Sequence, residues 1–185
     1  AANTLIGGAG DDYLSGIAGD DILNGGSGVD QLIGGDGVDT ITYAGSATGV
    51  EIYLDSGVTW DGTSTDFLQS IENVIGSAHA DYLMGSAGAN VLTGGAGNDT
   101  LEGGDGTDTA VYSGNREAYT ISLSGGVTTI VGPDGTDTLT NVERLQFADG
   151  LYDIGGAPLA AMPQVMPALA GDKSATGPEV MPTAP

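Results

Sequence analysis

The sequence predicts an all-β protein, a parallel β-solenoid in two repeat blocks with a C-terminal β cap. Three observations lead to this fold class. A nine-residue period recurs in two separate blocks, the 185 residues include 34 glycines and 25 acidic residues, and apolar residues alternate with polar ones between and after the blocks. A disordered acidic linker has a similar composition, but such a linker gains nothing from a strict period.

The repeat has the pattern G-G-x-G-x-D-x-(aliphatic)-x and occurs eight times. From Gly7 the chain reads GGAGDDYLS, GIAGDDILN, GGSGVDQLI and GGDGVDTIT, and from Gly76 it reads GSAHADYLM, GSAGANVLT, GGAGNDTLE and GGDGTDTAV. Glycines at positions one, two and four permit the positive φ of a tight turn. The last three positions predict a short strand in which the aliphatic side chain of position eight faces inward. Because one nonapeptide cannot bury one leucine, we expect coils of two repeats that stack about 4.8 Å apart.

Stacking of such coils brings together turns that are eighteen residues apart in the sequence. Position six of each turn is Asp or Asn, so neighbouring carboxylates repel one another unless a cation lies between them. Carboxylate and backbone carbonyl oxygens, six or more around one ion, suit calcium better than magnesium or zinc. The position-six residues are Asp12, Asp21, Asp30, Asp39, Asp81, Asn90, Asp99 and Asp108.

The Gly-Gly-x-Gly-x-Asp pattern resembles the haemolysin-type calcium-binding repeats of the RTX proteins, and the resemblance covers about residues 1 to 150. It implies a parallel β-roll, a right-handed β-solenoid, that holds several Ca²⁺ ions, about five to eight in this chain. It also implies that each ion is bound by the carbonyls of positions one and three and the aspartate of one turn. Positions two and four and the aspartate of the next turn on that side complete the site.

Carried over to this chain, the resemblance implies four sites, each between two turns. Their ligands are Gly7, Ala9 and Asp12 with Gly26, Gly28 and Asp30; Gly16, Ala18 and Asp21 with Gly35, Gly37 and Asp39; Gly76, Ala78 and Asp81 with Gly95, Gly97 and Asp99; and Gly85, Ala87 and Asn90 with Gly104, Gly106 and Asp108.

Several repeats depart from the pattern. Asn90 replaces a carboxylate by a neutral amide, so we expect its site to be weaker. Glycine is replaced at position two by Ile17, Ser77 and Ser86, and at position four by His79. These changes predict that the outer edge of the second block is less regular.

The repeats divide the chain into five segments. Alternating apolar residues predict a bridging solenoid coil between the blocks, with a plain linker as the alternative. Strands after the second block predict a cap that covers the open edge of the last coil. The segments are the first block (1–42), the bridging coil (43–75), the second block (76–111), the C-terminal β capping region (112–154) and a Pro/Ala-rich tail that we expect to be disordered (155–185).

Acidic residues outside the repeats leave two alternatives open. Asp55, Asp61 and Asp66 could bind an additional ion or belong to a solvated loop. Asp137 and Asp149 could share an ion or have a structural role in a turn.

Composition excludes several functions. A net charge of -22 with only three basic residues argues against nucleic-acid binding, and no apolar run is long enough to span a membrane. His79 is the only histidine, no HExxH motif is present, and the paired acids Asp11–Asp12 and Asp20–Asp21 fall within repeat turns. We therefore expect neither a catalytic site nor an organic cofactor in this chain.

The sequence is best interpreted as a non-catalytic calcium-binding module that folds on extracellular calcium. It would support type I secretion and folding of a larger bacterial protein, either secreted or held at the cell surface. One alternative is the C-terminal part of a secreted RTX enzyme (a metalloprotease, lipase or epimerase) whose catalytic domain is absent. Another is a repeat segment of an adhesin or S-layer protein. Asn3 falls in register nine residues before Asp12, which predicts that the array continues upstream, where a catalytic or adhesive domain would lie.

Overall fold

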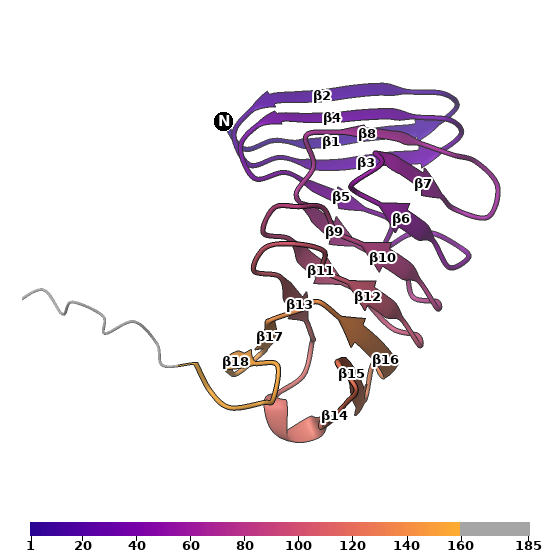
Figure 1. Ribbon diagram of the computed structural model, residues 1–185. Coiled ribbons are helices and arrows are strands. Elements are labelled where there is room, and N and C mark those ends of the chain that lie inside the picture. Colours follow the sequence, from indigo (N-terminus) through magenta and orange to yellow (C-terminus); the bar gives the residue numbers. More distant parts are fainter. Residues whose placement is uncertain (160–185) are drawn as a thin grey trace, which may run out of the picture.

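The computed structural model describes residues 1–159, which form 18 β-strands and one 3-10 helix, Arg116–Ala118. The strands make two sheets on opposite sides of a solenoid (Figure 1). Sheet A contains, in spatial order, β1 (Thr4–Ala9), β3 (Ile22–Ser27), β5 (Thr40–Thr42), β9 (Asn73–Ile75), β11 (Val91–Thr93), β13 (Thr109–Val111), β17 (Arg144–Phe147) and β18 (Gly150–Asp153). Sheet B contains β14 (Thr120–Ser124), β15 (Val127–Gly132), β16 (Gly135–Thr140), β12 (Thr100–Glu102), β10 (Tyr82–Met84), β6 (Glu51–Tyr53), β7 (Val58–Trp60), β8 (Phe67–Gln69), β4 (Gln31–Asp36) and β2 (Tyr13–Ala18). From residue 160 onward the predicted tail lies outside the described residues.

Within each block, consecutive repeats alternate between the two sheets. β1 pairs in parallel with β3, and β2 pairs in parallel with β4, each at a register of eighteen residues: Thr4 lies opposite Ile22 and Tyr13 opposite Gln31. The pairs β10–β12 and β11–β13 of the second block keep the same register. The predicted all-β fold with parallel two-repeat coils is therefore confirmed.

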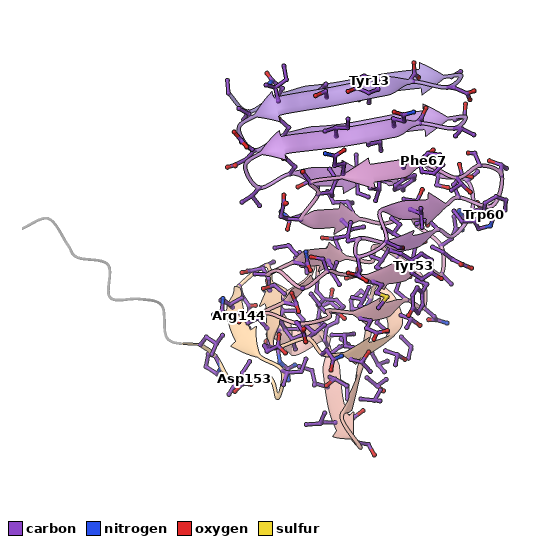
Figure 2. All side chains as sticks on the ribbon, turned by 45° about the horizontal axis from the view of Figure 1, so that its top comes forward. Tyr13, Tyr53, Trp60, Phe67, Arg144 and Asp153 are labelled. Carbon is purple, nitrogen blue, oxygen red and sulfur yellow. The ribbon has the colours of Figure 1, made fainter. Side chains whose placement is uncertain are left out.

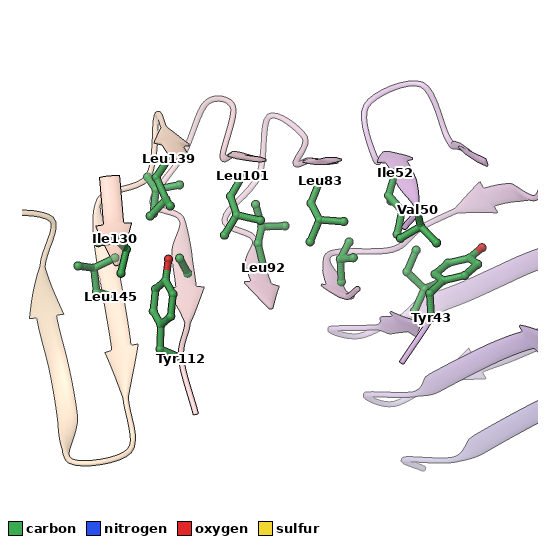
Figure 3. Packing of buried hydrophobic residues seen from close by; sticks show 14 of the residues in the cluster. Tyr43, Val50, Ile52, Leu83, Leu92, Leu101, Tyr112, Ile130, Leu139 and Leu145 are labelled. Carbon is green, nitrogen blue, oxygen red and sulfur yellow. The ribbon is translucent and has the colours of Figure 1, made fainter. Parts of the chain in front are cut away.

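The core between the sheets includes a row of aliphatic side chains from position eight of the repeats, which buried residues of the bridging and capping segments such as Ile52, Leu139 and Leu145 extend (Figure 3). The first coil, at the open N-terminal end, is the exception, since Leu5 and Leu14 are only partly buried there. Everywhere else these side chains have no more than 1% of their surface exposed. They are Leu23, Leu32, Ile41, Leu83, Leu92, Leu101 and Ala110.

The turns of the two blocks differ in backbone conformation. In the first block β1 to β4 are six residues long because pairing continues into the turn, where Gly26, with φ of 101°, packs so closely that a methyl group would collide with Gly8 O. Ile17 adopts the same left-handed conformation (φ 73°) despite its side chain. Ser77 and Ser86 do not adopt it, and the strands of the second block are only three residues long.

The segment between the blocks adds strands to one sheet only. In sheet A, β5 pairs with β9, which pairs with β11, so a single strand separates the two blocks. In sheet B, three strands separate them: β8 pairs in parallel with β4, β7 is antiparallel to its neighbours, and β6 pairs in parallel with β10. Side chains alternate along this meander, since Thr59 is buried whereas Trp60 and Phe67 lie on the outer surface (Figure 2).

A second meander of the same design follows the second block. β14, β15 and β16 correspond to β6, β7 and β8, because β16 pairs in parallel with β12 as β8 does with β4. Both meanders end in a seven-residue sequence, D-x-L-x-(S/N)-(I/V)-E, at residues 66–72 and 137–143, which we call the closing motifs. Ser70 and Asn141, at the same place in these motifs, have left-handed φ values of 52° and 50°. Residues 1–159 therefore contain two halves, each with four repeats and one closing motif.

The second half ends differently from the first. β14 is the outermost strand of sheet B, whereas its counterpart β6 pairs with the next block. β17 pairs with the antiparallel β18 instead of a further repeat. Residues 155–159 then fold back on β18, where Leu159 N–H donates to Leu151 O.

The stacked core predicts the effect of truncating one of its side chains. Leu92 is fully buried between the sheets, so Leu92→Ala should lower the free energy of unfolding by about 2–5 kcal/mol. The matched control Leu123→Ala lies on β14, where the side chain is 60% exposed, and should change it by less than about 0.5 kcal/mol. Urea unfolding in saturating calcium measures both, and equal losses would contradict the assignment of the core.

Candidate metal centre

Two ladders of side chains run along the solenoid, each formed by residues at or just before the start of parallel strands of one sheet. Within each half of the described chain, one side-chain oxygen accepts the backbone N–H of the equivalent residue in the preceding coil, for example Asp30 Oδ1 from Asp12 N at 2.9 Å and Asp39 Oδ1 from Asp21 N at 2.8 Å. Between the halves the partners change: Asp81 Oδ1 accepts Val50 N–H, and the Asn90 amide donates to Glu72 O. The sheet A ladder contains Asn3, Asp21, Asp39, Glu72, Asn90, Asp108 and Glu143. The sheet B ladder contains Asp12, Asp30, Asp66, Asp81, Asp99 and Asp137.

The structure brings together the four predicted pairs of position-six residues. Besides the two pairs above, Asp99 Oδ1 accepts Asp81 N–H at 2.9 Å and Asp108 Oδ1 accepts Asn90 N–H at 2.8 Å. The eighteen-residue spacing of the sequence thus becomes contact between neighbouring turns.

The second carboxylate oxygen of most ladder aspartates has no hydrogen-bond partner among the described residues. These oxygens are buried, and a buried charged oxygen without a partner destabilises the fold. An ion between the turns would supply the missing partner, so the residues present fit a bound cation. The oxygens are Oδ2 of Asp12, Asp21, Asp30, Asp39, Asp99 and Asp108.

Backbone carbonyls lie beside these oxygens. A methyl group on Gly7 would meet both Asp12 Oδ2 and Gly25 O, the carbonyl of position one in the next turn. The carbonyl oxygens of Gly8 and Gly10 face the next turn, where methyl groups on Gly26 and Gly28 would meet them. The space between two turns therefore contains carboxylate and carbonyl oxygens, the ligands that calcium prefers.

The direction of these carbonyls differs from the predicted ligand set. That set pairs positions one and three of one turn with positions two and four of the next, for example Gly7 and Ala9 with Gly26 and Gly28. In the structure, positions two and four face the following coil, and positions one and three face the preceding one. Ser27 O, for example, accepts Gly10 N–H at 2.8 Å. The second block has the same direction, since Ser77 O and Ser86 O lie beside Gly95 and Gly104 of the next coil.

In two turns of the second block, a serine donates hydrogen bonds to the ladder residue of its own turn, and we call these turns serine-closed. Ser77 donates its N–H to Asp81 Oδ2 at 2.6 Å and its hydroxyl to Asp81 Oδ1 at 2.7 Å. Ser86 N–H donates to Asn90 Oδ1 at 2.7 Å. Each second-block pair therefore has one unpartnered oxygen, on Asp99 or Asp108, where each first-block pair has two. Both serines are visible in the sequence as replacements of glycine. Their spacing of four residues from Asp81 and Asn90 is the signal that could have predicted these hydrogen bonds.

Sequence reasoning missed the ladder positions in the closing motifs. Asp66 and Glu72 accept the N–H groups of Asp30 and Asp39 at 2.9 and 2.8 Å. The signal was the recurrence of the closing motif at a fixed length. The second motif is used in the same way: Asp137 accepts from Asp99 N at 3.0 Å, and Glu143 accepts from Asp108 N at 2.8 Å.

Comparison with known proteins agrees with this geometry. The model of the RTX calcium-binding nonapeptide repeat matches four copies, over residues 1–32, 15–45 and 75–110. The chain carries RTX calcium-binding nonapeptide repeats and forms a β-roll. RTX repeats bind calcium and are structural modules rather than catalytic ones.

No curated protein matches the chain. Among solved structures it is similar to the extracellular lipase LipA from Serratia marcescens, with 18% sequence identity and a TM-score of 0.33. The match covers 86% of this chain and 38% of the lipase, so the chain spans well under half of that enzyme. Within residues 1–159, no helix is long and apolar enough to cross a membrane.

The paired acids of the RTX turns have distinct structural roles. Asp11 Oδ1 accepts Val29 N–H at 2.8 Å and Asp20 Oδ1 accepts Val38 N–H at 3.0 Å, so position five also joins one coil to the next. Its partner at position six belongs to the ladder. Hydrogen bonding between coils thus accounts for both members of each pair.

Outside the RTX repeats, the acidic residues considered as ligands of additional ions do not converge on a common site. Asp61 Oδ1 accepts the N–H groups of Thr63 and Ser64 within its own turn, while Asp66 Oδ2 accepts the hydroxyl of Tyr43 at 2.5 Å. Asp149 Oδ1 accepts Arg116 N–H, whereas Asp137 Oδ1 accepts Asp99 N–H in the sheet B ladder. No three acidic or histidine side chains converge within residues 1–159, so an ion in an RTX turn depends on backbone carbonyls.

Burial makes the ladder carboxylates resist ionisation when no metal is bound. It raises the pKa of Asp99 from 3.8 to about 7, and the negative charges of Asp137 and Asp81 add to the effect. Burial also raises the pKa of Asp30 and of Asp108. Both neighbouring charges and desolvation thus oppose the metal-free fold at neutral pH.

The serine-closed turns predict unequal effects of two matched substitutions. Asp99→Asn removes a charge whose Oδ2 has no protein partner, so it should raise the calcium concentration at the folding midpoint severalfold. Asp81→Asn should raise it less, because Asp81 Oδ2 already accepts the N–H of Ser77. Circular dichroism during a calcium titration compares the two variants, and equal midpoints would show that serine closure has no effect on ion binding.

The raised pKa values predict that acid stabilises the metal-free roll. For Asp99 the folded pKa of about 7 lies above the ordinary 3.8, so its contribution is fully favourable below pH 3.8 and is lost as the pH rises through 7. The β-sheet signal of the metal-free chain should therefore increase from pH 8 to pH 5, and Asp99→Asn should flatten this dependence. A metal-free chain that loses β-structure over the same range would contradict the assignment.

Proposed function

We propose that this chain is a calcium-gated folding module of a larger secreted protein. It stays unfolded at the low calcium of the cytosol and folds on the calcium outside the cell, which makes export through a type I secretion channel directional. The observation that carries this proposal is the set of six buried aspartate oxygens without a partner in facing turns.

Several terms oppose folding without calcium. The chain has 34 glycines and a net charge of -22, and glycine loses more conformational freedom on folding than any other residue. Ladder carboxylates stack between coils, and burial raises the pKa of Asp99 and Asp30. The aliphatic core is only one side chain wide per repeat, so hydrophobic burial has little reserve to offset these terms.

Calcium reverses this balance. Each ion that binds only the folded chain stabilises it by RT ln(1 + [Ca²⁺]/Kd), about 1.4 kcal/mol at ten times Kd. Extracellular calcium modules have Kd values of about 10⁻⁴ to 10⁻³ M. Because a coil is stable only when its neighbours are in place, several such ions add to one cooperative transition, and binding energy becomes folding energy.

The ligands favour calcium over magnesium. The turns offer two carboxylates and several backbone carbonyls, and these belong to glycine and other small residues that leave room for irregular coordination. Magnesium requires six ligands in a compact octahedron and keeps part of its water shell, which a space between two backbone turns does not accommodate.

Export follows from the same balance. A chain without stable structure at low calcium can pass through a narrow channel, and folding on arrival prevents its return. We place the protein outside the cell or on the cell surface, and we assign calcium and the type I secretion machinery as its partners. A catalytic or adhesive activity, if the parent protein has one, belongs to another part of that protein.

A calcium titration of the full chain tests the proposal. In chelator the far-UV circular dichroism should show little β-structure, and a cooperative gain should occur between about 0.1 and 1 mM free calcium. Magnesium at the same concentration is the control and should give no such transition. A chain that is already rich in β-structure in chelator would exclude calcium-gated folding.

A further inference from the structure

The geometry points to a binding site for guanidinium groups on the outer face of sheet B, where an arginine-rich segment of a basic protein would dock. This inference goes beyond the proposed function, because neither the repeat turns nor their ions take part in the site. We call the site the aromatic-acid patch. Its residues come from β6, β7, β10 and β12, and they are Glu51, Tyr53, Trp60, Tyr82 and Glu102.

The strand register brings these side chains together. The central residue of each of the four strands is buried between the sheets, so the residues on either side of it face outwards. Glu51 lies opposite Trp60 on one neighbouring strand and opposite Tyr82 on the other. Tyr53 follows Glu51 by two residues and faces the same way. The carboxylate of Glu51 therefore has aromatic neighbours on three sides.

Hydrogen bonds hold two of the rings in place. Tyr53 donates its hydroxyl to Glu51 Oε2 at 3.1 Å, and Tyr82 donates its hydroxyl to Glu102 Oε2 at 2.9 Å. The two rings lie against each other, with their centroids 5.5 Å apart. Each hydrogen bond occupies one oxygen of a carboxylate and leaves the other for a ligand. Because rings and carboxylates already restrain one another, little side-chain freedom is lost when a ligand binds.

Aromatic rings beside a carboxylate suit a guanidinium group. A cation within roughly 6 Å of a ring centroid is attracted to the face of the ring. The planar guanidinium of arginine can stack on a ring while its N–H groups donate to a carboxylate, which the ammonium of lysine cannot do. Trp60 is 44% exposed and Glu51 is also exposed, so both are accessible. One arginine can contact Glu51 and an adjoining ring, and a second can reach Glu102.

Charge favours a basic partner over other occupants of this face. The net charge of -22 repels a second copy of the chain, nucleic acid and anionic lipid, and it speeds encounter with a cation. Glu51 and Glu102 lie outside both ladders, so ions in the turns do not neutralise them. The two arginines of the chain are placed elsewhere: Arg116 lies over the ring of Phe147, and Arg144 is on β17 in sheet A.

The exposed aromatic surface continues from the patch towards the first coil. Tyr53 lies opposite Val58, and Val58 lies opposite Phe67, which is 52% exposed. Gln31 follows Phe67 in the same row, and Tyr13, which is 65% exposed, ends it (Figure 2). Aromatic side chains thus recur on every second strand, about 9.6 Å apart. An extended segment can therefore lie along the roll with its arginines at the patch and apolar side chains beyond it.

Titration of the calcium-loaded full chain with hexa-arginine, blocked at both ends, tests the inference. Trp60 is the only tryptophan, so its fluorescence reports binding at the patch. Hexa-arginine should change this fluorescence saturably at physiological salt. Hexa-lysine, which has the same charge, should bind more weakly because an ammonium group cannot stack on the rings.

Variants separate the patch from the overall charge, with isothermal titration calorimetry as the measurement. Tyr82→Leu keeps every charge and should raise the Kd of hexa-arginine about two- to fivefold, and Tyr53→Leu should act in the same direction. Glu51→Gln should also raise the Kd. The matched control Glu117→Gln removes the same charge from the exposed 3-10 helix and should leave the Kd unchanged. Circular dichroism in calcium verifies that each variant folds.

Three results would overturn the inference. The first is an equal Kd for the unaltered chain, Tyr82→Leu and Glu51→Gln, since binding would then reflect net charge alone. The second is a Trp60 response to the uncharged oligosaccharide cellohexaose and none to hexa-arginine, and the third is dimerisation that buries Trp60. Hexa-arginine binding that persists in chelator would instead contradict calcium-gated folding and leave the patch standing.

Discussion

The structure depends on one hydrogen bond repeated along two ladders, in which an aspartate carboxylate accepts the backbone N–H of the equivalent residue one coil earlier. This bond sets the register between coils, because it links residues eighteen apart at 2.8–2.9 Å in every repeat pair. It also fixes the carboxylate in a buried position and uses only one of its two oxygens. The need for a cation is therefore a consequence of how the coils are joined, and a metal-free roll keeps its register only at an electrostatic cost.

The sequence was sufficient for the fold and for the positions of the acidic side chains. Strict spacing determines both, since a nine-residue period can bury Leu23 and Leu32 only if alternate repeats lie in opposite sheets. The direction of the turn carbonyls could not be predicted from this spacing. At position two the carbonyl faces the next coil in both blocks, from Gly8 towards Gly26 and from Ser77 towards Gly95, although Gly8 is left-handed and Ser77 is not.

The closing motifs were harder to recognise because their function is carried by different residue types at different spacing. Glu72 occupies a ladder position that Asp holds elsewhere, and Ser70 presents a carbonyl that Gly25 presents in a repeat. A search for the nonapeptide pattern cannot find them. Only the second copy at 137–143 shows that the spacing is a feature of the fold, since both copies pair their strands and turn their backbones alike.

The two blocks differ in the hydrogen bonding of the second carboxylate oxygen of their ladder aspartates. In the first block the oxygens of Asp12 and Asp30 are both without protein partners, so the order of its coils is tied to bound ions. In the second block Ser77 supplies hydrogen bonds to Asp81 from within the same turn, which lowers the cost of forming that turn without metal. Because coils are stabilised by their neighbours, the hydrogen bonds of Ser77 also favour the coils that stack on its turn, whereas each first-block turn depends on an ion for the same oxygen.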